Sequence, residues 1–367
     1  MVDLLPGDPA PWFYCAALDG NQRYAFDTTA GRHILMLFLG SAGLPASAAA
    51  LATALRHRPL YDDDRVCFFG VTTDPSDVSD RRIEQSLPGI RHFLDYDGAV
   101  SRQYGAIPDG EKGDQVTYRP GWLLLDPALR VIARAPIERG EDIIAILRRE
   151  LAAPPIVDHA PVLIVPRIFE PGLCRQLIDL YDRQGGEESG FMRDVNGKTT
   201  AIIDHAHKRR ADCEIDDEAL RTQLRARLKR FLLPQIERAY NFKVTRIERW
   251  IVACYDAGVG GHFRAHRDNT TKGTAHRRFA CTINLNAGDY EGGDLRFPEY
   301  GTRSYRAPTG GAVIFGCSLL HEALPVRKGR RYAFLPFLYD EDGARIREAN
   351  NQFLDPGVGQ YRSGLSA

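Results

Sequence analysis

Apolar positions in the first part of the chain alternate between two spacings. His33–Leu39 is an apolar run of strand length, whereas Ser47–Arg56 is rich in alanine and leucine and is typical of a helix. Arg65–Thr72 and Gly121–Leu125 are two further strand-like runs. Strand patterns that alternate with helical ones predict an α/β layer with at least some parallel pairing.

The second part of the chain shows helices first and short strands afterwards. Pro171 begins a helix that should run to about Arg183, and Asp216–Ala239 has the spacing of a longer amphipathic helix. From Thr245 onward, short strand-like runs are separated by glycine-rich turns. The clearest runs are Arg246–Tyr255, Arg278–Asn286, Gly311–Phe315 and Arg330–Leu338. This order favours a double-stranded β-helix, or jelly roll, with supporting helices.

A proline-rich stretch separates the two patterns. Residues 151–161 contain three prolines, which break helices and favour extended backbone. An amphipathic helix is expected before this stretch at Asp142–Leu151, and a strand after it at Val162–Val165. The sequence therefore predicts two domains and a C-terminal tail, with the boundaries 1–152, 160–345 and 346–367.

Composition narrows the class of protein. The 48 basic and 48 acidic residues balance, whereas a dedicated nucleic-acid surface would normally show a basic excess. Apolar runs are far shorter than the ~20 residues that span a bilayer. No signal peptide is expected, because Met1–Asp8 lacks a basic segment followed by an apolar one. The seven scattered cysteines favour reduced thiols in a cytoplasmic protein. From the charge balance and the short apolar runs we expect neither nucleic-acid nor membrane partners.

Candidate metal chemistry gathers around His266, Asp268 and His321. On a strand, His266 and Asp268 would project to the same face, because they are two residues apart. His321 follows the predicted strand at Gly311–Phe315 after a short turn. Two histidines and one carboxylate form the facial triad of non-haem Fe(II), which leaves coordination positions open. The alternatives are a surface histidine beside a turn aspartate, and His262 as a rival ligand of the same parity.

The residues after His321 make the assignment more specific. They read His-Glu-Ala-Leu-Pro-Val-Arg-Lys-Gly-Arg-Arg-Tyr, with Arg331 ten positions after the histidine. Together with Arg278–Asn286 and the Gly-Gly turn of Tyr290–Phe297, this segment resembles the prolyl 4-hydroxylase-like branch of the 2-oxoglutarate/Fe(II) dioxygenases, over about residues 160–340. The resemblance implies a jelly roll that binds Fe(II) and the cosubstrate 2-oxoglutarate, with ascorbate as a reductant.

The same resemblance implies roles for individual residues. Arg331 would pair with the distal carboxylate of 2-oxoglutarate, and the hydroxyl group of Tyr255 would also contact it. O2 and an organic or peptidyl substrate would complete a hydroxylation that releases succinate and CO2. The alternative functions kept open are a non-catalytic binding protein and a thiol peroxidase. A homodimer is the assembly kept open. The candidates for substrate binding or catalysis are Thr282, Asn284, Arg264, Arg278 and His262.

The first 150 residues are similar to peroxiredoxins, a family with a thioredoxin fold. The similarity rests on Leu5–Phe13, Gly70–Asp77 and Arg119–Asp126. Peroxiredoxins place their reactive cysteine in the loop after the first strand, where this chain has Ser47. A serine hydroxyl ionises far less readily than a thiol and cannot form a sulfenic acid. We therefore expect a redox-inactive domain with a structural, docking or substrate-presenting role.

Overall fold

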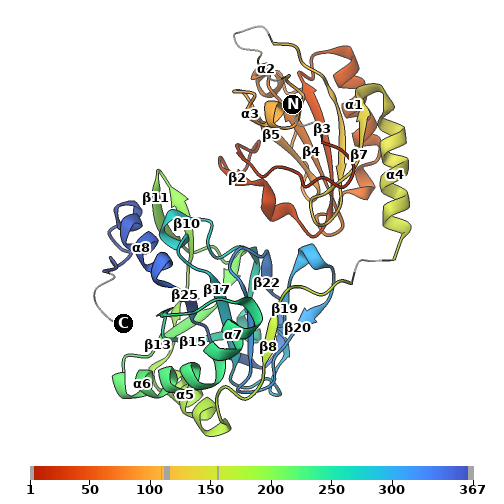
Figure 1. Ribbon diagram of the computed structural model, residues 1–367. Coiled ribbons are helices and arrows are strands. Elements are labelled where there is room, and N and C mark those ends of the chain that lie inside the picture. The colour runs from red at the N-terminus through yellow and green to blue at the C-terminus, as the bar shows by residue number, and fades with distance from the viewer. Residues whose placement is uncertain (1–3, 109, 111–115, 155–156, 363–367) are drawn as a thin grey trace. The chain divides into compact units, whose positions relative to one another are not determined.

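The computed structural model describes residues 4–108, 110, 116–154 and 157–362. The chain divides into two compact units, each of which is described by itself (Figure 1). Unit 1 runs to Asp158 and includes Pro298–Thr302, and unit 2 contains His159–Phe297 and the residues from Arg303 onward. Among the described residues, no helix is both long and apolar enough to cross a membrane.

A five-stranded mixed sheet with the order β5-β4-β3-β6-β7 forms the centre of unit 1. Strands β3, β4 and β5 pair in parallel, whereas β6 and β7 are added antiparallel on the other side of β3. The strands of unit 1 are β1 (Tyr14–Cys15), β2 (Tyr24–Ala25), β3 (His33–Gly40), β4 (Val66–Thr72), β5 (Ile90–Leu94), β6 (Gly121–Leu125) and β7 (Val131–Pro136). This is a thioredoxin-like arrangement, so the α/β class predicted for the first part is confirmed.

Two helices, α1 (Pro45–Arg56) and α4 (Gly140–Ala152), lie on one face of this sheet (Figure 1). Their apolar sides share a buried core with alternate residues of β3, namely Leu35, Leu37 and Leu39. The shorter helices of unit 1 are η1 (Phe26–Thr29), η2 (Arg58–Leu60), α2 (Ser76–Ser79), α3 (Ala99–Gln103) and η3 (Ile137–Arg139). Both predicted helices of this half are therefore present, and α4 extends one residue beyond its predicted end.

Helices cover one face of the largest sheet of unit 2. The predicted helix at 216–239 is present as two α-helices with a π-helical segment between them. The helices are α5 (Pro171–Gln184), α6 (Glu218–Arg227), the π-helical segment η4 (Leu228–Leu232), α7 (Leu233–Tyr240) and α8 (Glu341–Ala349), with short helices η5 (Ala257–Val259), η6 (Lys272–Thr274), η7 (Pro298–Tyr300, in unit 1) and η8 (Asn350–Phe353). Helix α8 runs across the position where the C-terminal tail was expected to begin.

Two larger sheets form the rest of unit 2. The first has nine strands in the order β14-β25-β17-β24-β15-β13-β9, with β21 pairing β17 and β8 pairing β21. Its strands are β8 (Leu163–Val165), β9 (Glu187–Glu188), β13 (Ala211–Glu214), β14 (Arg246–Glu248), β15 (Ile251–Asp256), β17 (Phe279–Asn284), β21 (Ala312–Gly316), β24 (Arg330–Phe334) and β25 (Phe337–Tyr339).

The second sheet has five strands in the order β12-β16-β22-β19-β20, and two hairpins accompany it. Its strands are β12 (Lys208–Arg209), β16 (His262–His266), β19 (Leu295–Arg296), β20 (Ser304–Tyr305) and β22 (His321–Ala323). The hairpins pair β10 (Phe191–Val195) with β11 (Lys198–Ile202) and β18 (Glu291–Gly292) with β23 (Val326–Lys328).

Strand alternation separates the core of the large sheet from its interior face. On β15 and β24, Cys254 and Phe334 pack with the helices in one hydrophobic core. Residues of the opposite parity, such as Tyr255 and Arg331, project to the other face. Arg331 shares a cavity there with Leu295 of the second sheet. The interior between the two sheets is therefore where polar side chains are buried.

Two predicted strands are each divided in the structure. The run at Arg246–Tyr255 breaks into β14 and β15 at Arg249, which has a positive φ of 73°. The run at Arg330–Leu338 breaks into β24 and β25 around Pro336, which has no N–H group to donate to a sheet. The apolar pattern continues through both breaks, and for this reason the sequence predicted single strands.

Candidate active site

Three potential metal ligands converge in unit 2. His266, Asp268 and His321 each offer one ligand atom, and these atoms all lie within 4.8 Å of one another. Nε2 of His266 lies 3.5 Å from one carboxylate oxygen of Asp268, and Nε2 of His321 lies 3.3 Å from the other. Across the described residues, no other group of three His, Cys, Asp or Glu side chains has this spacing.

The pairing of β16 with β22 brings the two histidines together. His266 lies opposite His321 in this antiparallel pair, and the ring centroids are 4.3 Å apart. His321 is thus the first residue of β22, whereas the sequence predicted only that it follows a strand and a short turn. Nδ1 of His266 lies 2.7 Å from the carbonyl oxygen of Arg264, and Nδ1 of His321 lies 3.0 Å from that of Leu319. Because a carbonyl oxygen only accepts, each Nδ1 carries the proton and each Nε2 keeps its lone pair.

Asp268 lies just beyond the end of β16 and is held by its backbone, whereas the sequence placed it on the strand. Its N–H group donates to the carbonyl oxygen of Cys317 over 2.9 Å, and its own carbonyl oxygen accepts from Arg277 over 3.4 Å. Arg277 is buried and pairs with Glu248 over 2.8 Å. Glu248 also accepts a hydrogen bond of 2.6 Å from His276. A buried charged network thus supports the turn that presents the carboxylate.

The protonation states of this group suit metal binding. Burial raises the pKa of Asp268, but the neighbouring His321, His266 and Arg277 outweigh this effect, and the net pKa lies below its ordinary value. Burial, with a contribution from His266, lowers the pKa of His321 to about 4. Carboxylate and neutral imidazole are the forms that bind metals.

Aromatic rings pack against both histidines. The ring centroid of Phe263 lies 3.5 Å from that of His266 in a stacked arrangement, and the ring centroid of Phe315 lies 4.5 Å from that of His321.

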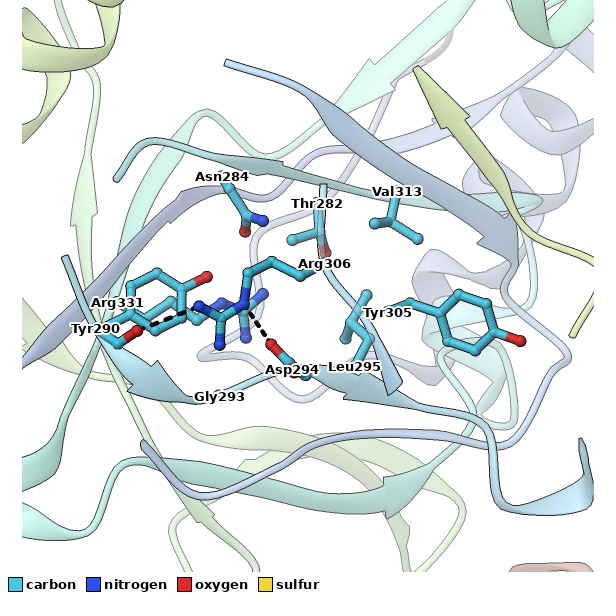
Figure 2. A pocket seen from close by; sticks show the side chains of 10 residues that line it. All are labelled: Thr282, Asn284, Tyr290, Gly293, Asp294, Leu295, Tyr305, Arg306, Val313 and Arg331. Atoms are coloured by element: carbon cyan, nitrogen blue, oxygen red, sulfur yellow. Dashed lines mark hydrogen bonds and ion pairs between the residues drawn. The ribbon is translucent and has the colours of Figure 1, made fainter. Parts of the chain in front are cut away.

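A cavity lies between the two sheets of unit 2 and contains buried polar atoms without partners (Figure 2). Arg331 is 3% exposed, and within the described part of the chain its Nε and Nη1 have no hydrogen-bond partner. Oδ1 of Asn284 and the hydroxyl group of Tyr290 are also buried and have no hydrogen-bond partner among the described residues. The cavity is lined by Thr282, Asn284, Tyr290, Gly293, Asp294, Leu295, Tyr305, Arg306, Val313 and Arg331. Such unpaired atoms are rare in proteins, so the cavity is suited to a polar ligand.

Arg306 is the second guanidinium group at this cavity, but its donors are already engaged. It donates to the carboxylate of Asp294 over 2.5 Å and to three main-chain carbonyl oxygens over 2.5 to 3.2 Å (Figure 2). Arg331 is therefore the cation that is available to a ligand. Thr282 and Asn284, two of the predicted candidates, also line the cavity.

Tyr255 stands directly opposite Arg331 in the pairing of β15 with β24. The guanidinium carbon of Arg331 lies 5.0 Å from the centroid of the Tyr255 ring. The Tyr255 hydroxyl accepts a hydrogen bond of 3.5 Å from Arg210. The structure thus brings Tyr255 and Arg331 together, while a second arginine contacts the tyrosine hydroxyl.

Three other predicted site residues lie apart from the ligand group. Each of their side chains contacts a main-chain carbonyl oxygen instead: His262 that of Gly260, Arg264 that of Ala206 and Arg278 that of Ala275. Arg264 is also exposed to solvent. None of the three belongs to the group of His, Asp and His ligands.

Sequence reasoning missed a basic cluster formed by Lys208 of β12, Arg210 between β12 and β13, and Arg249 between β14 and β15. Arg210 and Arg249 both contact Asp212, at 2.6 and 3.1 Å. Lys208 is 4% exposed, and its ammonium group donates to the hydroxyl oxygen of Ser189 over 2.8 Å. The run of basic residues at 208–210 was a signal, but a surface charge run would look the same in the sequence.

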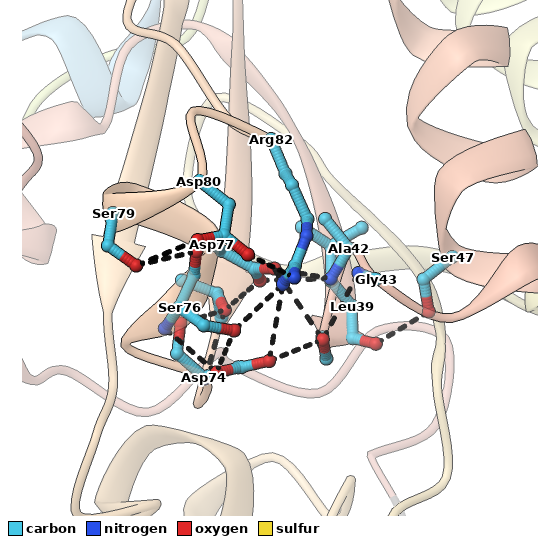
Figure 3. A network of polar contacts seen from close by, with 12 residues as sticks. Leu39, Ala42, Gly43, Ser47, Asp74, Ser76, Asp77, Ser79, Asp80 and Arg82 are labelled. Carbon is cyan, nitrogen blue, oxygen red and sulfur yellow. Dashed lines mark hydrogen bonds and ion pairs between the residues drawn. The ribbon is translucent and has the colours of Figure 1, made fainter.

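Ser47 lies in the first turn of α1 rather than in a loop, and hydrogen bonds hold this turn and the residues before it. The buried Ser47 hydroxyl donates to the carbonyl oxygen of Leu39 over 2.7 Å. The preceding turn is fixed by Asp77, whose carboxylate accepts from the N–H group of Ala42 over 2.9 Å. Arg82 lies among the carboxylates around this turn (Figure 3) and contacts Asp77 over 3.2 Å. The Ser47 hydroxyl is therefore engaged by the backbone.

The two cysteines of unit 1 are poor nucleophiles. Burial, with contributions from Asp95 and Asp97, raises the pKa of the Cys15 thiol to about 12. Burial also raises the pKa of the Cys67 thiol to about 12, although the charge of Arg32 opposes this. All seven cysteines of the chain are free thiols. Because the thiolate is the reactive form, neither cysteine of unit 1 is activated for attack on peroxide.

Comparison with known proteins assigns the second part of the chain. Residues 250–339 match the model of the 2OG-Fe(II) oxygenase superfamily, a stretch that contains His266, Asp268, His321 and Arg331. Unit 2 contains a 2OG-Fe(II) oxygenase domain. A PKHD-type hydroxylase of Polaromonas sp. is 28% identical over 208 residues, which are 53% of this chain and 84% of the relative. The chain spans only about half (51%) of the length of two PKHD-type hydroxylases of Synechococcus sp. that it also matches.

The comparison with solved structures also gives partial matches. A Pseudomonas putida prolyl-4-hydroxylase is 19% identical with a TM-score of 0.35, and the match covers 53% of this chain and 98% of that one. A mutant of Xanthomonas campestris peroxiredoxin Q is 18% identical with a TM-score of 0.34, and the match covers 41% of this chain and 99% of that one. The resemblance of the second part to the oxygenases is confirmed by the family match of the oxygenase domain.

Proposed function

We propose that this protein is an Fe(II)- and 2-oxoglutarate-dependent hydroxylase that acts on an organic or peptidyl substrate and releases succinate and CO2. One observation carries the proposal. Unit 2 holds both a compact group of two histidines and one aspartate and a buried arginine with unpaired donors. The family match of the oxygenase domain supports it.

His266, Asp268 and His321 would hold the Fe(II) ion. Two neutral imidazole groups and one carboxylate are the ligand set of non-haem Fe(II) oxygenases, and three protein ligands leave other coordination positions for small molecules. The fit rests on the lone pairs of both Nε2 atoms, which the Nδ1 contacts direct toward the carboxylate. Arg277 would keep Asp268 in place through its backbone carbonyl.

Arg331 would bind the distal carboxylate of 2-oxoglutarate. A guanidinium group forms charge-assisted hydrogen bonds with a carboxylate, and the unpaired Nε and Nη1 are donors that such a ligand can use. The unpaired hydroxyl group of Tyr290 can donate to the same ligand, and Thr282 and Asn284 would line its path. When bound, Fe(II) with 2-oxoglutarate and O2 would supply the oxidising power to hydroxylate a C–H bond, with ascorbate as a reductant.

The residues of the chain would orient the reactants and keep water away. The rings of Phe263 and Phe315 pack against the two histidines and limit their movement. We interpret the two sheets of unit 2 as a double-stranded β-helix around this interior. Unit 1 would have a structural, docking or substrate-presenting role in a cytoplasmic enzyme, because its Ser47 hydroxyl is engaged and its thiols are protonated.

Anaerobic metal titration of the full chain tests the proposed ligand set. We expect one Fe(II) per chain, and we expect His266→Ala or His321→Ala to remove this binding. His262→Ala is the matched control, because His262 lies on the same strand but outside the ligand group. Full Fe(II) affinity in either ligand variant, or loss of affinity in the control alone, would contradict the assignment.

A further inference from the structure

The buried amine of Lys208 lies close to the proposed metal ligands but has no anionic partner. Its ammonium group donates to the hydroxyl oxygen of Ser189 over 2.8 Å and to the carbonyl oxygen of Gly190 over 2.5 Å. It also lies 4.9 Å from the ring centroid of Phe263, the ring that stacks on His266. Among the residues that the structure describes, no ion pair joins Lys208 to a carboxylate. Both hydrogen-bond acceptors are neutral, so neither supplies a negative charge to pair with the protonated amine.

The surroundings of Lys208 have more basic groups than acidic ones. Arg210 and Arg249 share the single carboxylate of Asp212. Arg210 is 7% exposed, and within the described residues its Nε has no hydrogen-bond partner. Three basic side chains therefore lie around one acidic side chain, and two of them, Lys208 and Arg210, are buried. A second negative charge is what this cluster lacks.

The protonation of Lys208 agrees with this charge balance. Burial, reinforced by the charge of Arg210, lowers the pKa of Lys208 to about 5. Asp212 acts in the opposite direction, Arg249 adds to the lowering, and the more remote Asp268 opposes it. Without an added anion, the cluster thus disfavours a third positive charge. An anion beside the amine would favour its protonated form.

This basic cluster is separated from the proposed cosubstrate arginine by one aromatic ring. The guanidinium carbons of Arg331 and Arg210 lie 5.0 and 5.8 Å from the centroid of the Tyr255 ring. Arg331 belongs to the cavity between the sheets, whereas Lys208 and Arg210 do not line it. The interior therefore has two groups of cationic donors, and 2-oxoglutarate needs only one of them for its distal carboxylate.

Aromatic side chains adjoin the basic cluster on the side of the metal ligands. The His207 ring lies 4.5 Å from that of Phe191 and 5.5 Å from that of Phe263. The same His207 ring is 6.4 Å from that of His266. A ligand anchored at Lys208 would thus have an apolar surface beside it that leads toward the metal ligands.

We propose that Lys208 and Arg210 bind a carboxylate of the substrate, so that the enzyme acts on a carboxylate-bearing molecule with an apolar part next to the acid. This inference rests on the proposed function, because it takes His266, Asp268 and His321 as the reaction centre. The carboxylate can belong to a free organic acid or to an acidic residue of a peptide. In both cases the ion pair would hold the apolar part beside Phe263.

Matched acids and amides test this site by titration calorimetry. The full chain is loaded anaerobically with Fe(II) and saturating 2-oxoglutarate, so that Arg331 is occupied. One pair of probes is 3-phenylpropanoate and 3-phenylpropanamide, and the other is a blocked Ala-Glu-Ala tripeptide and its Ala-Gln-Ala counterpart. We expect at least one acid to bind tenfold or more tightly than its amide, and the pair that shows this preference identifies the source of the carboxylate.

Variants locate the preference for the acid. Lys208→Met should bring the acid and the amide to within twofold of each other, whereas Lys328→Met, which changes an exposed lysine, should keep the wild-type ratio. Lys208→Gln replaces Lys208→Met if that variant does not fold. The site is wrong if neither acid is preferred by the wild type, or if the preference persists in the Lys208 variant.

The test separates this site from the proposed function. The titrations are repeated on the metal-free full chain, where the carboxylate site does not depend on Fe(II). A preference for the acid that depends on Lys208, in a chain that fails to bind Fe(II), would refute the proposed function and retain the anion site. Fe(II) and 2-oxoglutarate binding without any preference for the acid would retain the proposed function and refute the site.

Discussion

Replacement of Arg331 by alanine is the sharpest perturbation of the proposed cosubstrate site. Arg331 is 3% exposed, and two of its donor atoms are unpaired within the described residues. Arg306 cannot take its place without losing its contacts with Asp294 and with three carbonyl groups. Removing one partner of a buried charged hydrogen-bonded pair costs about 2–5 kcal/mol. Because each 1.4 kcal/mol is tenfold, the Kd for 2-oxoglutarate should rise between about 30-fold and about 4,000-fold.

The assay is an anaerobic titration of the Fe(II)-loaded full chain with 2-oxoglutarate, followed by the visible charge-transfer band of the chelated complex. Fe(II) affinity should be unchanged in Arg331→Ala, because the arginine is not a metal ligand. Arg330→Ala is the matched control, since Arg330 is the neighbouring arginine, is 57% exposed and pairs with Asp256. A large effect of Arg330→Ala, or a change below threefold for Arg331→Ala, would refute the role given to Arg331.

Three further predictions address other parts of the structure. Ser47→Ala should leave 2-oxoglutarate turnover nearly unchanged and the full chain should consume no peroxide with thiols; Cys15- or Cys67-dependent consumption would contradict this. Arg277→Met should weaken Fe(II) binding about tenfold or more, because it removes the support of Asp268, and unchanged affinity in a metal titration would refute that role. For Lys208, the folded pKa of about 5 lies below the ordinary value of 10.5, so the folded form binds fewer protons between these values. Wild-type stability relative to Lys208→Met should therefore fall with falling pH in that window, by up to about 1.4 kcal/mol per pH unit. Urea denaturation at pH 6 and pH 9 checks this, and an equal difference at both pH values would contradict it.

The elements with strong periodicity were predictable from the sequence. The buried strand predicted at 33–39 and the helix predicted at 47–56 follow from their apolar composition, although α1 begins two residues earlier, at Pro45. The helix that begins at Pro171 follows from apolar spacing and from the proline at its first turn. The convergence of His266, Asp268 and His321 was predictable only because the spacing matched a known family. Local periodicity alone carries no information on which strands pair across the interior.

The remaining features depend on tertiary contacts that leave no local pattern. The left-handed backbone at Arg249 and the break at Pro336 divide strands whose apolar pattern is continuous. Lys208 and Arg210 look like surface charges in the sequence, yet the pairing of β12 with β16 and of β13 with β15 buries them. Burial of a charged side chain is decided by the strand partner, so the sequence alone did not predict this cluster.

Succinate formation from 2-oxoglutarate is the measurement that tests the central claim most directly. The full chain with Fe(II), O2 and ascorbate should release succinate, even if slowly in the absence of the substrate. His262→Ala should retain this activity, whereas Asp268→Ala should give no more succinate than a protein-free blank. Undiminished succinate from Asp268→Ala, or none from a wild-type chain that has bound Fe(II), would contradict the assignment of this protein as a 2-oxoglutarate-dependent oxygenase.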